Sequence, residues 1–560
     1  MKIRKTLFVG LFILGLFSFN NCKNKSKLNP ELASIGLITG DLLLCGDGQF
    51  GEVSFSLSCD YAVRDAFDLA VSLLHSFEYA EAEKAFAKVI DVDPECAMAY
   101  WGVAMSIYHA LWRAPDPEDL EKGLRVLKLA EPLSKTTKEQ EYLDAISAYY
   151  IDWEKIDHKT RALRMEKKME GIYKAYNDDT EAAIFYALAL KSTADPEDKS
   201  HSNERKAGKI LESIFPEQPN HPGIAHYIIH NYDNPELAPM ALTTARRYAD
   251  IAPTSAHAQH MPSHIFTRLG LWDESINSNL RSADAARCYA DASGMEGHWT
   301  SEIHALDYLL YAYLQQGNTA KTKELYEYIS GIKIVWGNNA SLAYPFAANP
   351  ARMVLENKDW EQAAILPIPS VALSWDKYPW EKSILHFTRA LGSAHLGNLI
   401  SAEKELATLQ SLQVDLVKLE DDYKADQVMI QVKATQAWIE FAKGNHEMAL
   451  KFMRESALLE DNTEKHPVTP GEVIPARELL GDLLLALDRP QEALEAYEMN
   501  LKKSPNRFNG LYGAAVAAKA LGDTQKSKQY FELLLNITEA SSSDRPEVEA
   551  AEAYIQQHVG

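Results

Sequence analysis

The sequence predicts an all-α fold, a superhelical solenoid of antiparallel helix pairs. From residue 61 onward, apolar residues recur every three or four positions, which is the spacing of amphipathic helices. Short turn signals built on glycine, asparagine or aspartate interrupt this pattern at fairly regular intervals. Regular interruptions of this kind indicate stacked repeats. Hydrophobic residues make up 46% of the chain and charged residues 24%, as in ordinary globular proteins.

The chain begins with "MKIRKTLFVGLFILGLFSFNNC", in which a basic start precedes an apolar run that ends near Cys22. This pattern predicts a lipoprotein-type signal peptide over residues 1–22, with a lipid attached to Cys22. Asn20 and Asn21 occupy positions where such signals usually have small residues, so plain cleavage nearby or an uncleaved anchor are alternatives. A lipidated Cys22 would hold the protein on a membrane of the cell envelope, facing the periplasm or the cell surface.

Residues 23–60 show no helical periodicity, and an irregular segment is expected there. Cys45 and Cys59 lie on either side of a glycine-containing stretch within it. We expect them to form a disulfide, because an exported chain meets oxidising conditions. Cys96 and Cys288 lie in helical patterns and are expected to be buried thiols.

The first helix pair is predicted in "AFDLAVSLLHSFEYAEAEKAFAKVIDVDPECAMAYWG". One helix should end near Ser76, and a second should cover about residues 80–90. Pro94 then prevents the second helix from continuing, because proline clashes with the preceding helical turn.

This unit resembles the tetratricopeptide repeat, a family whose repeat places two antiparallel helices in about 34 residues. Ala82, Phe86 and Pro94 match the alanine, aromatic residue and proline of the family pattern, whereas Val89 stands where another alanine is common. The resemblance covers roughly residues 61–540. It implies a curved stack in which the first helix of each pair lines the concave face.

A second clear pair lies at 473–537, where one family repeat length separates the turn signals at Asp488 and Gly522. The predicted organisation is a signal peptide over 1–22, an irregular segment over 23–60, an N-terminal repeat array with a histidine cluster over 61–390, C-terminal repeats over 391–545, and a tail over 546–560.

Six of the 17 histidines fall between residues 221 and 264. His226 and His230 are four residues apart and so share one face of a helix. His260 and His264 show the same spacing one family repeat length further along the chain. Because one repeat period separates the pairs, they are expected to face the same way on neighbouring helices.

His257 joins the second pair on one face if Pro262 leaves the helix continuous. Counting back from the next turn, His304 corresponds to His257, and Asp307 corresponds to His260. A third helix is therefore expected to bring a histidine and an aspartate beside the first two.

This cluster indicates a site for a transition metal such as zinc, copper or iron, all of which accept imidazole nitrogen. The candidate ligands are His226, His230, His257, His260, His264 and His304, with Asp233 and Asp307 as possible carboxylate ligands or bases. Two alternatives stay open: the histidines contact a ligand or peptide without a metal, or they pack inside the repeats. Repeat duplication alone could also produce the register.

The net charge of −22, with no visible basic patch, argues against a nucleic-acid partner. The chain has no H-E-x-x-H, no G-x-S-x-G and no P-loop motif.

The stretches "HPGIAHYIIHNYDNPELA" and "HAQHMPSHIFTRLGLWDESI" resemble a group of exported bacterial tetratricopeptide-repeat proteins, which implies a fold and a site location but no reaction. We expect a cell-envelope lipoprotein that binds a protein, peptide or small ligand in its concave groove, with the histidines on the groove floor. A metal-dependent hydrolase or oxidase using the same cluster is the alternative.

Overall fold

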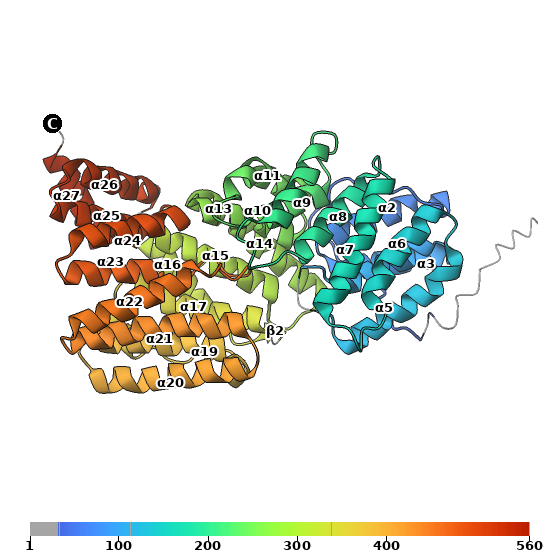
Figure 1. The fold of residues 1–560 in the computed structure, drawn as a ribbon. Coiled ribbons are helices and arrows are strands. Elements are labelled where there is room, and N and C mark those ends of the chain that lie inside the picture. Colours follow the sequence, from blue (N-terminus) through green and yellow to red (C-terminus); the bar gives the residue numbers. More distant parts are fainter. Residues whose placement is uncertain (1–31, 33, 112–113, 338, 542, 559–560) are drawn as a thin grey trace, which may run out of the picture.

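The computed structural model describes residues 32, 34–111, 114–337, 339–541 and 543–558. Helices dominate this part of the chain and follow one another as antiparallel pairs (Figure 1), which confirms the predicted all-α solenoid. Within the same residues, no helix has both the length and the apolar character needed to cross a membrane. Cys22 and the predicted signal peptide lie outside the described residues.

The N-terminal half begins close to where the sequence predicts it. The helix expected to end near Ser76 ends at His75, and its partner is slightly longer than expected. The elements are η1 (Tyr61–Val63), α2 (Arg64–His75), α3 (Tyr79–Val92), α4 (Ala97–Tyr108), α5 (Pro117–Ala130), η2 (Glu131–Leu133), α6 (Thr137–Tyr150), α7 (His158–Ala175), α8 (Thr180–Ser192), α9 (Ser202–Ile214), α10 (Pro222–Tyr232), α11 (Ala238–Ile251), α12 (Ala256–His260), α13 (Pro262–Leu269) and α14 (Trp272–Ser293).

The C-terminal half continues the pattern, with one short pair of parallel strands that joins His298 to Val335 and Trp299 to Trp336. Its elements are β1 (His298–Trp299), α15 (Thr300–Gln315), α16 (Thr319–Gly331), β2 (Val335–Trp336), α17 (Ala340–Glu356), α18 (Trp360–Ala364), η3 (Trp375–Lys377), α19 (Pro379–His395), α20 (Leu399–Lys418), α21 (Asp422–Ala442), α22 (His446–Asp461), α23 (Ala476–Ala486), α24 (Pro490–Lys503), α25 (Phe508–Ala520), α26 (Thr524–Thr538) and α27 (Pro546–Gln557). The segment predicted as a tail thus contains α27, which packs on α26.

The first helices of successive pairs pack on one another, as a solenoid requires. In the C-terminal half, α15 contacts α17, and the series continues through α19, α21, α23 and α25. In the N-terminal half, α2 contacts α4, α4 contacts α6, and α8 contacts α10. There α10 also returns to contact α2, so the superhelix is tightly wound. The inner helices α4, α8 and α10 are accordingly buried along almost their whole length.

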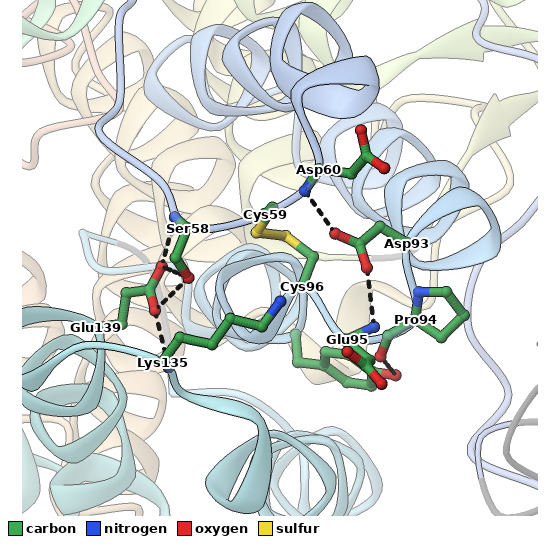
Figure 2. Close-up of a disulfide and its surroundings, with 10 residues drawn as sticks. Ser58, Cys59, Asp60, Asp93, Pro94, Glu95, Cys96, Lys135 and Glu139 are labelled. Carbon is green, nitrogen blue, oxygen red and sulfur yellow. Dashed lines mark hydrogen bonds between the residues drawn. A yellow bond between two sulfur atoms is a disulfide. The ribbon is translucent and has the colours of Figure 1, made fainter.

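Two disulfides fasten the irregular N-terminal segment to the repeats, and they differ from the predicted pairing. Cys45 bonds to Cys288 in α14, and Cys59 bonds to Cys96 just before α4 (Figure 2). The prediction of a Cys45–Cys59 bond is therefore wrong, as is that of free thiols at Cys96 and Cys288. The segment runs across the repeats, so its two cysteines reach different helices.

Carboxylates on the helices hold the same segment through its backbone. Glu83 accepts from the Ile38 amide at 2.6 Å, and Glu139 accepts from the Ser58 amide at 2.9 Å. An extended chain without strand partners needs such acceptors, because buried amides are costly when unpaired. The segment is therefore a fixed strap despite its lack of regular structure.

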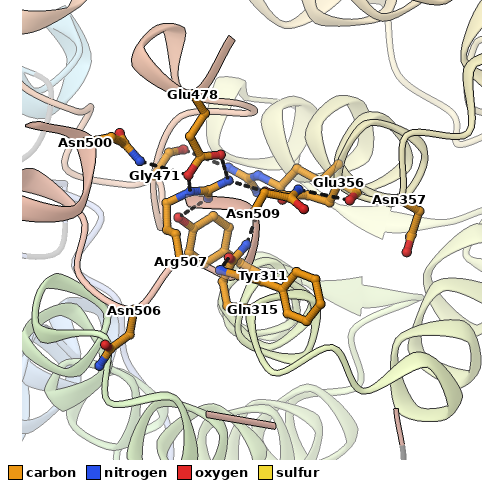
Figure 3. Close-up of polar contacts among 12 residues, drawn as sticks. Tyr311, Gln315, Glu356, Asn357, Gly471, Glu478, Asn500, Asn506, Arg507 and Asn509 are labelled. Atoms are coloured by element: carbon orange, nitrogen blue, oxygen red, sulfur yellow. Dashed lines mark hydrogen bonds and ion pairs between the residues drawn. The ribbon is translucent and has the colours of Figure 1, made fainter. Parts of the chain in front are cut away.

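A buried ion network joins the repeats of the C-terminal half (Figure 3). The Arg507 guanidinium has no exposed surface, and it donates to Glu356 at 2.6 Å and to Glu478 at 2.6 Å. It also donates to the hydroxyl of Tyr311 at 2.7 Å. Because these partners come from α15, α17 and α23, one side chain ties three helices together.

Candidate metal centre

The structure gathers all six candidate histidines in two groups. His226 and His230 of α10 meet His257 of α12, and we call these three the first histidine triad. The second histidine triad consists of His260 of α12, His264 of α13 and His304 of α15. In each triad, one nitrogen from every ring lies within 4.8 Å of the others.

The triads repeat one another, and the two pairs in them have the register that the sequence predicts. His257 differs from the prediction, because it joins His226 and His230 instead of His260 and His264. Each joins a pair of histidines four residues apart to one histidine from a later helix. Pro262 does not disrupt this arrangement, because α12 ends at His260, Met261 keeps helical angles, and α13 begins at Pro262. The helical run is thus nearly continuous, and proline at the first position of α13 needs no amide donor.

The histidines lie inside the helix stack. His226 is 0% exposed, His260 2% and His264 5%, and the other three rings are partly buried. This differs from the expected position on the floor of an open groove. Tight winding explains the difference, because the first helices cover one another.

Hydrogen bonds fix how three of the rings point. The Nδ1 atom of His226 donates to the carbonyl oxygen of His75 at 2.6 Å, because a carbonyl can only accept. The Nδ1 atom of His260 donates to Oδ1 of Asn279 at 2.7 Å. Asn279 is itself oriented, since its amide nitrogen donates to the Ser275 carbonyl at 2.7 Å.

Asp233 orients His264 in the same way. Its carboxylate accepts from Nδ1 of His264 at 2.8 Å and from Nε of Arg268 at 2.9 Å. Lys465 adds a third positive neighbour, 3.6 Å from the carboxylate. Burial opposes ionisation, but Lys465, Arg268 and His264 outweigh it and hold the pKa of Asp233 well below its usual range.

The Nε2 atoms of these three rings therefore face the interior of the triads. Those of His226 and His257 lie 3.0 Å apart, and those of His260 and His264 also lie 3.0 Å apart. Burial lowers the pKa of every triad imidazole, and repulsion from a neighbouring histidine, should both be protonated, lowers most of them further. The rings are thus neutral, the state in which imidazole binds metals.

Neither predicted aspartate belongs to a triad within the described residues. Asp233 accepts a hydrogen bond from Nδ1 of His264. Asp307 pairs with Arg352 at 2.6 Å, and both side chains are completely buried. Asp233 thus supports the second triad, whereas Asp307 belongs to a separate ion pair.

Aromatic rings cover both triads. Phe77, a non-glycine residue with a positive φ of 60°, places its ring 4.4 Å from that of His226 and 5.4 Å from that of His257. Tyr308 lies 4.7 Å from His260 and 5.1 Å from His264, measured between ring centres. Local helix periodicity does not reveal Phe77 as a neighbour, because Phe77 belongs to the first helix pair, several repeats before the histidines that it contacts.

A further buried group, His75, Glu181 and His221, was not found from the sequence. Nε2 of His75 lies 2.9 Å from Glu181, and Nε2 of His221 lies 2.8 Å from its other oxygen. Burial alone would raise the pKa of Glu181, but the two histidines lower it to about 2. Each imidazole–carboxylate contact is completed by an N–H on the histidine, so this group needs no metal. It supports the first triad, because the His75 carbonyl orients His226.

Neither a protein-family model nor a curated protein matches the sequence. Among solved structures, yeast Tom70 is 12% identical, with 89% of this chain and 96% of that chain aligned and a TM-score of 0.33. Human IFIT1, crystallised as a dimer with m7Gppp-AAAA, is 14% identical, with 86% and 96% aligned and a TM-score of 0.37. The ligands of Tom70 and IFIT1 belong to those proteins and say nothing about what this chain binds. The stacked antiparallel pairs described above give this chain the architecture of a tetratricopeptide-repeat protein.

Proposed function

We propose that the protein binds two transition-metal ions, one in each histidine triad. The observation that carries this proposal is the 3.0 Å separation between Nε2 of His260 and Nε2 of His264. Both rings already use their Nδ1–H groups to donate to Asn279 and Asp233. A neutral imidazole has one donor nitrogen and one acceptor nitrogen, so the two Nε2 atoms present lone pairs to each other.

A shared proton could also relieve that repulsion, but its cost is high. It would create an imidazolium in a buried site that already holds the positive charges of Arg268 and Lys465. Burial also lowers the pKa of both histidines. A metal with two bonds of about 2.0–2.1 Å at a tetrahedral angle holds its nitrogens a little over 3 Å apart. The observed separation is close to that value.

The first triad shares part of this arrangement. His226 donates its Nδ1–H to a carbonyl, and its Nε2 lies 3.0 Å from Nε2 of His257. Nε2 of His230 is buried and has no hydrogen-bond partner within the described residues. Ligands whose second nitrogen donates to a carbonyl, amide or carboxylate are typical of protein metal sites.

The test is a metal titration of the chain lacking residues 1–22. After chelation and desalting, the protein is titrated with copper(I) or zinc(II), and bound ions are counted by native mass spectrometry. We expect two ions per chain for wild type and one for either His226→Ala or His264→Ala. His386→Ala is the matched control, because His386 pairs with Glu405 outside both triads and should leave two ions bound. No bound ion with either metal, or two ions in both triad variants, contradicts the proposal.

We infer an envelope location with a lipid on Cys22, and the two disulfides support it, since such bonds persist in oxidising compartments. Fractionation of cells that express Cys22→Ala tests the anchor. The variant should move from the membrane to the soluble fraction, and membrane retention equal to wild type would contradict lipidation. Binding of a protein or peptide in the concave groove stays a prediction, separate from the buried metal centre.

A further inference from the structure

The two triads offer ligands of one kind only. Within the described residues, each triad contains three neutral imidazoles and no carboxylate. Divalent ions at two such sites would bring four positive charges into the helix stack with no anionic ligand to offset them. Burying uncompensated charge is costly, so the donor set favours ions of low charge.

The surroundings of the second triad strengthen this preference. The negative charge of Asp233 is shared between Arg268 and Lys465, and that of Asp307 is matched by Arg352. These five buried groups together carry one excess positive charge, and the carboxylates of Glu464 and Glu472 also act on Arg268. Copper(I) has a single charge and accepts imidazole nitrogen, unlike zinc, whose stable ion is divalent.

The two triads adjoin each other along α12. His257 belongs to the first triad and His260 to the second, and they are three residues apart on α12. At 1.5 Å of rise per residue, their backbones differ by about 4.5 Å along the helix. Two-metal centres in proteins typically hold their ions about 3.5–4 Å apart. A small molecule that touches both ions requires the two triads to hold them at about this spacing.

We propose that the paired triads form a coupled dicopper centre that binds dioxygen between the two ions. The inference rests on the proposed metal binding and names the ligand of that site. Each copper(I) gives one electron to dioxygen, which becomes a bound peroxide dianion, while both ions become copper(II). No bond to carbon and no proton is involved. The charge of the centre is two positive before and after, so the buried surroundings do not oppose the step.

Burial and ring packing limit what else can reach the ions. His226, His260 and His264 are at most 5% exposed, and His230, His257 and His304 are partly buried. The rings of Phe77 and Tyr308 pack against the triads. A diatomic gas can pass through such packing by small side-chain motions, whereas a peptide or sugar needs an open cleft. The ligand class that fits is thus a small, uncharged molecule.

Oxygen uptake of the copper-loaded protein tests the inference. The chain lacking residues 1–22 is loaded anaerobically with two copper(I) ions and then mixed with oxygenated buffer in a closed electrode cell. We expect one dioxygen consumed per two copper ions, a new near-ultraviolet absorption band, and no copper(II) signal in electron paramagnetic resonance, because the paired spins cancel. His304→Ala should lose stoichiometric uptake, and His386→Ala should keep it.

The outcomes separate the two proposals. Two bound copper ions without oxygen uptake, or with an uncoupled copper(II) signal and free hydrogen peroxide, overturns the dioxygen centre and leaves the metal site standing. Failure to bind copper overturns the dioxygen centre, and metal binding then depends on the zinc titration. Zinc-loaded protein is the negative control, because zinc(II) has no electron to give. Circular dichroism of His304→Ala against wild type shows whether the variant keeps its helices.

Discussion

Asp233 accepts a hydrogen bond of 2.8 Å from Nδ1 of His264, on the side of the ring that faces away from the second triad. The contact fixes the imidazole so that Nε2 points inward. The carboxylate also makes Nε2 a stronger donor to a metal, because a negative partner increases the electron density on the ring. Asp233 is therefore a positioning residue, whereas Asp307 lies in an ion pair of its own.

Replacing Asp233 should weaken metal binding, and replacing Asp307 should not. Asp233→Asn keeps a hydrogen-bond acceptor but loses the charge, and we expect about 10- to 100-fold lower affinity for one of the two ions. Competition with a chelator of known affinity measures this change. Asp307→Asn should keep both affinities while lowering stability by about 3–5 kcal/mol, because it leaves Arg352 buried without its partner. Equal losses of affinity in both variants would contradict the assignment.

The sequence predicts the repeats well where the signal is local. The helix pair around Ala82 and Phe86 and the pair around Asp488 appear where expected, because helix periodicity and turn residues depend on neighbours in the chain. The strap over residues 34–60 has no such periodicity. Carboxylates of distant helices hold it, and those contacts leave no trace in its own sequence.

The candidate metal centre, like the fold, is predictable from the sequence only where the signal is local. The spacing of histidines along each helix, together with a register of one repeat length, predicts that the six histidines cluster. It does not predict their division into two triads, because it places His257 with His260 and His264 rather than with His226 and His230. Several groups that orient or contact them lie far away in sequence: the His75 carbonyl is 151 residues from His226. Lys465 comes from the loop before α23. Only the folded superhelix brings these elements to the triads.

Peptide mapping without reduction tests the disulfides. We expect linked peptides for Cys45–Cys288 and for Cys59–Cys96, because these sulfurs are bonded in the structure. Cys288→Ser should lower the free energy of unfolding by about 2–5 kcal/mol, since the bond closes a long loop in the unfolded chain. Comparison of urea transitions with and without reductant measures the contribution. A linked Cys45–Cys59 peptide would contradict the pairing.

Removing the charge of Arg507 should destabilise the protein strongly. Arg507→Met leaves Glu356 and Glu478 buried without their cation, and a loss of about 3–5 kcal/mol is expected from urea unfolding. Lys526→Met is the matched control: its partner Glu498 lies at the surface, and the expected change is below about 1 kcal/mol. Adding Glu356→Gln and Glu478→Gln to Arg507→Met should recover part of the loss. Similar losses for Arg507→Met and Lys526→Met would show that the buried network contributes no more than a surface pair.

Glu381 on α19 should make stability depend on pH. Its side chain is 1% exposed, and one carboxyl oxygen has no hydrogen-bond partner within the described residues. Burial raises the pKa of Glu381 to about 7, although Lys424 opposes the shift. The folded state therefore holds the proton more tightly than the unfolded state, whose value is about 4.3. The stabilising contribution of Glu381 to the free energy of unfolding is full below the unfolded-state pKa, declines as the pH rises, and is lost above about pH 7.

Glu381→Gln cannot ionise, so it should be close to wild type at pH 4 and more stable by up to about 3 kcal/mol at pH 8. Thermal unfolding from pH 4 to pH 8 measures the difference, with Glu361→Gln on the exposed face of α18 as the control. A constant difference between Glu381→Gln and wild type across this range would show that Glu381 does not titrate there.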